Sequence, residues 1–209
     1  MTTEVTQRLS IFPLPGALLF PRLNLPLHIF EPRYRAMVSD ALARDRRIAM
    51  IQPRTEGLVP DLYEVGCVGR IAGVEALDDG RYNIMLEGVA RFRIRSEIDA
   101  TTPFRQVEAD FGGFLDDPGE TLPFVLRADF ESEARRFADA RGIALDWDAL
   151  LTLDDEMLIN GSAQVAPFDV AAKQALLEAP TLVDRADLMV QLLRFFRDQG
   201  EGDNRVTLQ

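Results

Sequence analysis

The chain has 209 residues, 47% of them hydrophobic and 27% charged, with a formal net charge of −11, which is typical of a soluble globular protein. Its single cysteine, Cys67, excludes an internal disulfide, and no apolar run approaches the roughly 20 residues that a membrane span needs. The chain opens on MTTEVTQRLS, without the basic and apolar regions of a signal peptide. We therefore expect a cytoplasmic protein with no membrane partner.

The acidic charge is concentrated in the second part of the chain. Residues 1–115 carry 14 basic and 15 acidic side chains, whereas residues 116–209 carry 9 and 19. Gly, Pro and Asp cluster at the boundary, in GGFLDDPGET, and these residue types favour turns. We expect two domains, 1–115 and 116–200, followed by a flexible tail, 201–209.

The segment from Leu9 to Leu42 combines two patterns of apolar residues. Up to Phe30 the apolar residues come in short runs interrupted by prolines, which predicts short edge strands and turns because proline cannot donate to a central ladder. From Pro32 onward they recur at helical spacing. The expected buried face of this helix consists of Tyr34, Met37, Val38, Ala41 and Leu42.

The rest of the first domain has the patterns of short strands. Glycines at Gly66, Gly69 and Gly73 predict bulges or sharp coiling, and the turn at 78–80, Asp-Asp-Gly, predicts a hairpin. About six strands with one early helix predict a closed or nearly closed barrel, because closure removes exposed strand edges. The strands after the helix are expected at 47–53, 64–77, 81–89, 90–98 and 104–111.

The second domain has helical periodicity throughout. Thr121 is expected to cap the first helix, with Pro123 in its first turn. Asp169 is expected to cap the third, and Thr181 with Asp184 forms a capping box for the fourth. The helices are expected at about 121–142, 146–158, 170–179 and 181–200.

Three stretches resemble, in this order, the N-terminal, substrate-binding domain of the Lon protease, over roughly residues 9 to 195. They are IFPLPGALLFPRLNLPLHIFEPRYRAMVSDAL, YEVGCVGRIAGVEALDDGRYNIMLEGVARFRI and VAAKQALLEAPTLVDRADLMVQLL. The form LHIFEPRYR is most similar to that of stand-alone Lon-domain proteins, which lack the ATPase and protease modules. The resemblance implies an α+β fold, with a PUA-like β-barrel followed by a helical bundle, and a role in recognising polypeptides.

The residues that ATP hydrolysis and proteolysis by Lon require are missing. A P-loop ends in Gly-Lys-Ser/Thr, but the only lysine, Lys173, stands between Ala172 and Gln174. A Ser-Lys dyad would have to use Lys173, with Ser162 as the candidate serine, yet Lys173 lies in a stretch that matches the binding domain. A solvent-facing lysine near a helix start is the favoured interpretation, so we expect no enzymatic activity.

Other chemistry is equally disfavoured. Cys67 and His28 could in principle form a thiol–imidazole pair. However, Cys67 lies in the middle of a predicted strand, where a free cysteine is usually a small buried hydrophobic residue. One histidine and one cysteine cannot complete a zinc site. The acidic runs 116–117 and 154–156 lack the spacing of a calcium loop. We expect no metal and no cofactor.

RNA binding is the main alternative, because PUA-type barrels bind RNA. Arg91, Arg93 and Arg95 alternate along one predicted strand and would share one face. However, three arginines on a chain of net charge −11 provide little positive charge for binding phosphate groups. Pairing with Glu75 or Glu87 on neighbouring strands is the favoured interpretation.

The predicted function is binding of unfolded or exposed apolar polypeptide segments, with their presentation to a separate protease or chaperone as a further hypothesis. The binding surface is expected at the turn from Pro21 to Tyr34 and in a groove between the domains. A third hypothesis is a protein–protein adaptor that acts through the acidic helical domain. The candidate peptide-binding residues are Leu23, Leu25, His28, Phe30, Glu31, Arg33 and Tyr34.

Several of these candidates also have a structural interpretation. A core position is the better interpretation for Tyr34. His28 is expected to be satisfied by a backbone carbonyl at a turn. Glu31 complements the helix dipole, and Arg33 or Arg35 is a candidate to pair with Glu31 or with the barrel wall.

Overall fold

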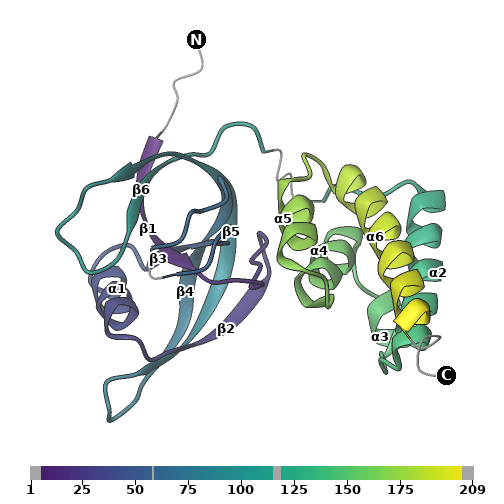
Figure 1. Cartoon of the computed structure of the whole chain (residues 1–209), viewed down its shortest axis with the longest axis horizontal. Coiled ribbons are helices and arrows are strands. Elements are labelled where there is room, and N and C mark those ends of the chain that lie inside the picture. The colour runs from purple at the N-terminus through teal and green to yellow at the C-terminus, as the bar shows by residue number, and fades with distance from the viewer. Residues whose placement is uncertain (1–5, 58, 115–118, 204–209) are drawn as a thin grey trace. The chain divides into compact units, whose positions relative to one another are not determined.

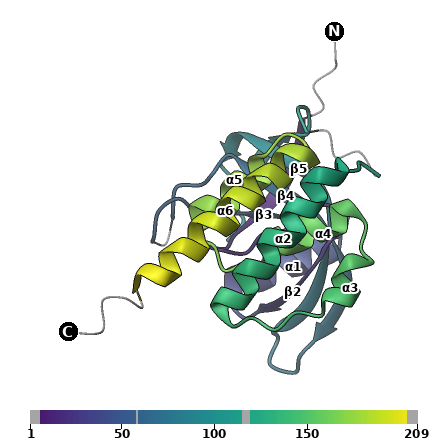
Figure 2. The same cartoon turned by 90° about the vertical axis from the view of Figure 1, so that its right-hand side faces the viewer.

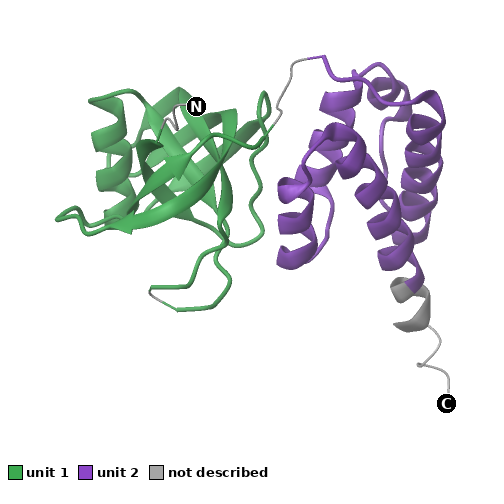
Figure 3. Ribbon diagram, turned by 90° about the horizontal axis from the view of Figure 1, so that it is seen from above, with its two compact units in different colours: residues 1–116 green, residues 117–209 purple. Residues whose placement is uncertain are grey.

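The computed structural model describes residues 6–57, 59–114 and 119–203. The chain divides into two compact units, Met1–Asp116 and Asp117–Gln209 (Figure 3). The described part of unit 1 holds all the strands and one helix, and that of unit 2 is helical, so the fold is α+β. No helix in the described ranges is long and apolar enough to cross a membrane.

The strands of unit 1 form one mixed sheet (Figure 1). Its order is β2-β5-β4-β3-β1-β6, and β6 also pairs with β5, so five of the strands are paired in a closed ring while β2 extends outward from β5. Only the β1–β3 pair is parallel among the described pairings. The strands are β1 (Thr6–Pro13), β2 (Asn24–Ile29), β3 (Arg47–Ile51), β4 (Val65–Ala76), β5 (Tyr82–Ile98) and β6 (Gln106–Asp110).

Strand β5 corrects the prediction of separate strands at 81–89 and 90–98, because it is continuous. Gly88 lies within this stretch in strand pairing with Gly69, and register shifts near Gly69 and Ile94 bend the strand without ending it. Its first half pairs with β2 and β4, and its second half pairs with β4 and β6. The same strand therefore closes the ring and carries β2 beyond it.

Two of the three glycines predicted at bulges lie at register shifts. Gly69 and Gly73 each follow a shift between β4 and β5, whereas Gly66 does not. A Cβ at Gly66 would lie 2.7 Å from the ring of Phe92, so this glycine leaves room for a core aromatic side chain. The predicted hairpin is confirmed, with Gly80 at φ +77°.

The core of unit 1 lies inside the ring and under helix α1 (Pro32–Leu42). The predicted helix is confirmed, and Tyr34, Met37, Val38 and Ala41 are buried. The ring of Tyr34 lies 4.2 Å from that of Phe12, and burial raises the pKa of Tyr34. Inside the ring the buried side chains are Leu9, Ile11, Ala49, Ile51, Val68, Phe92, Val107 and Ala109.

In unit 2, α6 lies along α2, as both views show (Figures 1 and 2). The predicted caps of Asp169 and Thr181 are confirmed: Ala172 N–H donates to Asp169 at 2.7 Å, and Asp184 N–H donates to Thr181 Oγ1 at 3.1 Å. The helices are α2 (Phe124–Arg141), α3 (Trp147–Leu151), α4 (Asp155–Val165), α5 (Val170–Glu178) and α6 (Leu182–Asp203). The final helix continues beyond the predicted tail start at 201, and 204–209 lie outside the described residues.

The prediction of one helix over 146–158 is wrong, because α3 ends and α4 starts inside it. Asp154 caps α4 by accepting from Met157 N–H at 2.7 Å. Arg127 donates to the carbonyls of Leu151 and Leu153 at 3.2 Å, which satisfies acceptors that a continuous helix would use internally.

The first helix of unit 2 also begins later than predicted. Pro123 is its N-cap residue, in an extended conformation, and Thr121 lies outside the helix. In α5, Ala171 is exposed, whereas Leu176 and Leu177 are buried. The acidic pair at 116–117 lies outside the described residues.

Glu133 ties α2 to α6 through a buried carboxylate. Its side chain is 5% accessible, with Arg197 Nη1 at 2.6 Å and Arg136 Nη1 at 2.8 Å. Burial acts to raise the pKa of Glu133, but the hydrogen bond from Arg197 and the charges of Arg136 and Arg194 outweigh it and lower the pKa. Ionisation of the Glu133 carboxyl group therefore stabilises the folded state.

The substitution Glu133→Gln should lower the free energy of unfolding at pH 7 by about 1–3 kcal/mol, since hydrogen bonds to a charged group are lost. Because the folded pKa lies below the unfolded value of about 4.3, the contribution is complete above that pH and is lost as the pH falls through the folded pKa. Urea unfolding at pH 7 and pH 3 measures both values. The control Asp129→Asn, at an exposed pair 3.6 Å from Arg194, should change little, and an equal loss in both variants would contradict the prediction.

Candidate functional site

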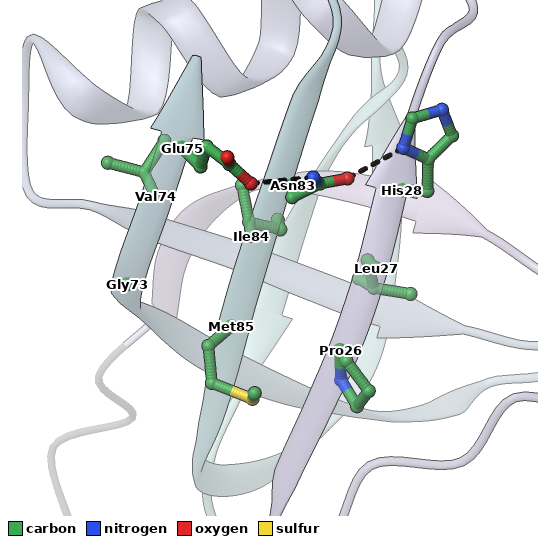
Figure 4. A pocket seen from close by; sticks show the side chains of 9 residues that line it. All are labelled: Pro26, Leu27, His28, Gly73, Val74, Glu75, Asn83, Ile84 and Met85. Carbon is green, nitrogen blue, oxygen red and sulfur yellow. Dashed lines mark hydrogen bonds between the residues drawn. The ribbon is translucent and has the colours of Figure 1, made fainter. Parts of the chain in front are cut away.

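An open hollow of about 570 Å³ lies on β4, β5 and β2 in unit 1 (Figure 4). We call it the β2 hollow. The strand register puts Gly73 opposite Met85, and Met85 opposite Pro26, across the three strands. The lining residues are Pro26, Leu27, His28, Gly73, Val74, Glu75, Asn83, Ile84 and Met85.

A row of hydrogen bonds crosses the hollow (Figure 4). His28 Nδ1 donates to Asn83 Oδ1 at 2.7 Å, and Asn83 Nδ2 donates to Glu75 Oε2 at 2.8 Å. Arg81 Nη1 lies 3.2 Å from His28 Nε2, and because a guanidinium only donates, Nε2 accepts this hydrogen bond. Side chains, not the predicted backbone carbonyl, therefore satisfy His28.

Apolar side chains border this polar row. Met85 and Val74 are 38% and 41% exposed, and Pro26 is exposed beside them. Phe30, at the end of β2, is 60% exposed, and its ring stacks 6.2 Å from that of His28. The surface thus offers apolar contact area with a few fixed polar groups, which is the usual composition of a binding site.

The hollow carries one unbalanced charge. Among the described residues that line it, Glu75 is the only acidic one, and none is an arginine or a lysine. The Glu75 carboxylate accepts a hydrogen bond from the neutral amide of Asn83. The site therefore favours a cationic group over an anionic one.

The structure separates the predicted peptide-binding residues. His28 lines the hollow, Phe30 stacks beside it, and Leu25 is half-buried on β2. Leu23 and Tyr34 are each only 6% exposed, which removes both from the candidate binding surface and agrees with the core position favoured for Tyr34. The carbonyl of Leu23 accepts from Gly88 N–H at 2.8 Å, and this bond fixes Leu23 against β5.

Glu31 and Arg33 lie at the start of α1, where they contact each other. Arg33 Nη2 lies 3.0 Å from Glu31 Oε2, so the expected ion pair is present. The guanidinium carbon of Arg33 also lies 4.5 Å from the ring centroid of Tyr34. Glu31 occupies the N-cap position but makes no side-chain cap hydrogen bond.

Sequence reasoning did not identify the residues of β4 and β5 in the hollow. Met85, Asn83 and Glu75 lie within strands that were predicted, on either side of the predicted hairpin. In a strand, alternate side chains point to opposite faces, so the sequence indicated that these residues lie on an exposed face of the sheet. Their proximity to His28 depends on the pairing of β2 with β5, across more than fifty residues, and no local pattern encodes it.

The predicted basic stripe is not an open surface. Arg91 is 1% exposed, and its guanidinium lies over the ring of Phe114 at 4.5 Å. Arg93 pairs with Glu64 at 3.0 Å, and Arg95 pairs with Asp110 at 2.8 Å. These partners differ from the predicted ones: Glu87 pairs with Arg70 at 2.7 Å, and Glu75 contacts Asn83.

Other reactive side chains are held in structural positions. Cys67 is fully buried and pairs with Arg91 on β5, whereas His28 pairs with Asn83, roughly 26 Å away at 3.3 Å per residue. Lys173 is buried rather than solvent-facing, donates to the Gln164 carbonyl at 3.2 Å, and has a pKa that burial lowers. No cluster of three metal-binding side chains occurs in the part of the chain that the structure describes.

The family model for the ATP-dependent protease La (LON) substrate-binding domain matches residues 8–194. The chain belongs to the LON substrate-binding domain family. Among curated relatives, Lon protease 1 of Bdellovibrio bacteriovorus is 25% identical over 93% of this chain, and Lon protease 2 of Sorangium cellulosum is 35% identical over 59%. The matches span 25% and 15% of those two proteins, so the chain corresponds to about a quarter or less of each relative.

Solved LON domains have the same fold. The Lon N-terminal domain protein from Xanthomonas campestris aligns with a TM-score of 0.67 and 21% identity, covering 90% of this chain and 98% of that one. The N-terminal domain of the Mycobacterium avium complex Lon protease aligns with a TM-score of 0.66 and 17% identity, with the same two coverages of 90% and 98%. The family and its fold are therefore shown independently of each other.

The positions of Leu23 and Phe30 predict effects of very different size on the stability of this LON domain. Leu23→Ala should lower the free energy of unfolding by about 2–4 kcal/mol, because it removes buried methyl groups and leaves a cavity. Phe30→Ala should change it by less than about 0.5 kcal/mol, because the ring is exposed. Urea unfolding measures both, and a larger loss for Phe30→Ala would contradict the assigned positions.

Proposed function

We propose that this LON domain binds polypeptide segments with exposed apolar residues through the β2 hollow. The observation that carries the proposal is the group of exposed side chains, Phe30, Val74 and Met85, around a hollow in a domain whose family is described as substrate-binding. Of the predicted residues, His28 and Phe30 are retained, with Leu25 at the margin. The predicted groove between the domains stays a prediction.

We further propose that binding is non-enzymatic and that the chain presents its clients to a separate protease or chaperone. The burial of Lys173 and Cys67 supports this proposal, since neither is accessible to a substrate. The closed ring of strand pairings supports the finer prediction that unit 1 is a PUA-like β-barrel. A cytoplasmic location remains part of the same proposal.

Filling the hollow should weaken peptide binding. A Cβ at Gly73 would meet only Met85 Cβ, at the ordinary contact distance of 3.6 Å, so the position tolerates a side chain. Gly73→Leu should therefore leave the fold intact and weaken binding of a fluorescein-labelled unfolded peptide about tenfold, equivalent to 1.4 kcal/mol. Fluorescence anisotropy measures the Kd.

The matched control is Ala72→Leu, which adds the same side chain to the same strand at an exposed residue outside the lining. It should bind like the wild type. Equal affinity in Gly73→Leu and wild type would exclude the hollow as the site, and no binding of any peptide would overturn the function. A single-stranded RNA of similar length, which should not bind, tests the RNA alternative.

The adaptor hypothesis also has an observation in its favour. Phe124 and Val125, in the first turn of α2, are 85% and 75% exposed within the acidic unit. Such side chains are candidates for contact with a partner protein. Phe124→Ser should leave the free energy of unfolding within about 0.5 kcal/mol of wild type and abolish capture of a lysate partner. Capture that is unchanged in Phe124→Ser would place the contact elsewhere.

A further inference from the structure

We infer that β2 binds its polypeptide as an added β-strand along its open edge, so that main-chain hydrogen bonds supply much of the affinity. The inference rests on the proposed polypeptide-binding function and specifies the occupant. That occupant is an extended segment with apolar residues on one face and a basic residue on the other. No strand in the described ranges pairs with the outer edge of β2.

Pro26 determines which backbone groups face this edge. It lies opposite Met85 in the antiparallel β2–β5 ladder. A hydrogen-bonded pair exchanges two N–H···O bonds, and proline has no N–H, so Pro26 and Met85 form a non-hydrogen-bonded pair. By alternation, the carbonyls of Pro26 and His28 and the N–H of His28 point away from β5, toward the open edge.

The inner face of β2 is incompletely covered at the same edge. Leu25 and Leu27 are half-buried, although their cross-strand partners, Leu86 and Ile84, are 0% and 3% exposed. The difference follows from position, since β5 has neighbours on both sides. Apolar side chains on an added strand would lie beside Leu25 and Leu27 and cover them.

Charge and hydrogen bonding identify the occupant. The unbalanced carboxylate of Glu75 at the hollow favours a basic side chain extended across the outer face. A second copy of this chain is a poorer occupant, because pairing of two β2 edges would place a proline in both strands. An extended segment from another protein would meet only one missing N–H, that of Pro26.

Alternate N-methylation of a peptide tests main-chain recognition directly. The probe is the fluorescein-labelled peptide TVTVRVTVT, with one version N-methylated on the valines and another on the intervening residues. In strand addition only one set of N–H groups faces β2, so one version should bind about 30-fold more weakly or worse, and the other about as well as the parent. Equal weakening in both versions would overturn strand addition.

Two further comparisons use the full chain. Replacing the arginine of the probe by glutamate should weaken binding up to about fivefold, as expected for an exposed charge interaction with Glu75. Pro26→Val adds an N–H to the open edge and should tighten binding about two- to tenfold, with the circular dichroism spectrum unchanged. If folded Pro26→Val binds the peptide as well as or more weakly than the wild type, the peptide does not bind along the edge of β2.

The outcomes separate this inference from the proposed function. If the parent peptide binds and Gly73→Leu weakens it, but N-methylation shows no dependence on position, the function stands and strand addition is overturned. If the parent peptide does not bind at all, both fail. If the parent peptide binds without any dependence on N-methylation, and analytical ultracentrifugation shows a dimer that the peptide does not dissociate, the peptide binds away from the edge and the inference is wrong.

Discussion

The structure of unit 1 depends on the continuity of β5. One strand pairs with β4 along most of its length, with β6 at one end and with β2 at the other. The register shifts let it bend enough to close the ring while its first half continues beyond the ring. Without that continuation β2 would have no partner, and His28 would not meet Asn83.

The candidate site is consequently a product of the sheet rather than of a loop. Its polar row and its apolar border come from three adjacent strands whose spacing is fixed by backbone hydrogen bonds. A surface held in this way loses little conformational freedom when a ligand binds. Its apolar and weakly charged character distinguishes it from the arginine positions of β5, where carboxylates and Phe114 already occupy the guanidinium groups.

Much of the fold was predictable because its signals are local. The buried face of α1, the hairpin at Gly80 and the caps at Asp169 and Thr181 follow from neighbouring residues. The break at Asp154 was missed because Arg127, from another helix, stabilises it. The site was found only in part: His28 and Phe30 lie in the proline-rich segment, whereas Met85 and Glu75 reach it through a long-range pairing.

The burial of Lys173 has a consequence for chemical reactivity. The chain carries 23 basic residues, of which Lys173 is the only lysine, so arginine supplies nearly all of its positive charge. Acylating reagents and lysine-directed tagging enzymes require an accessible primary amine, and this ε-amine is enclosed beside the Gln164 carbonyl. Under the proposed function, a bound client that exposes lysines would therefore be modified at those lysines, whereas Lys173 would not.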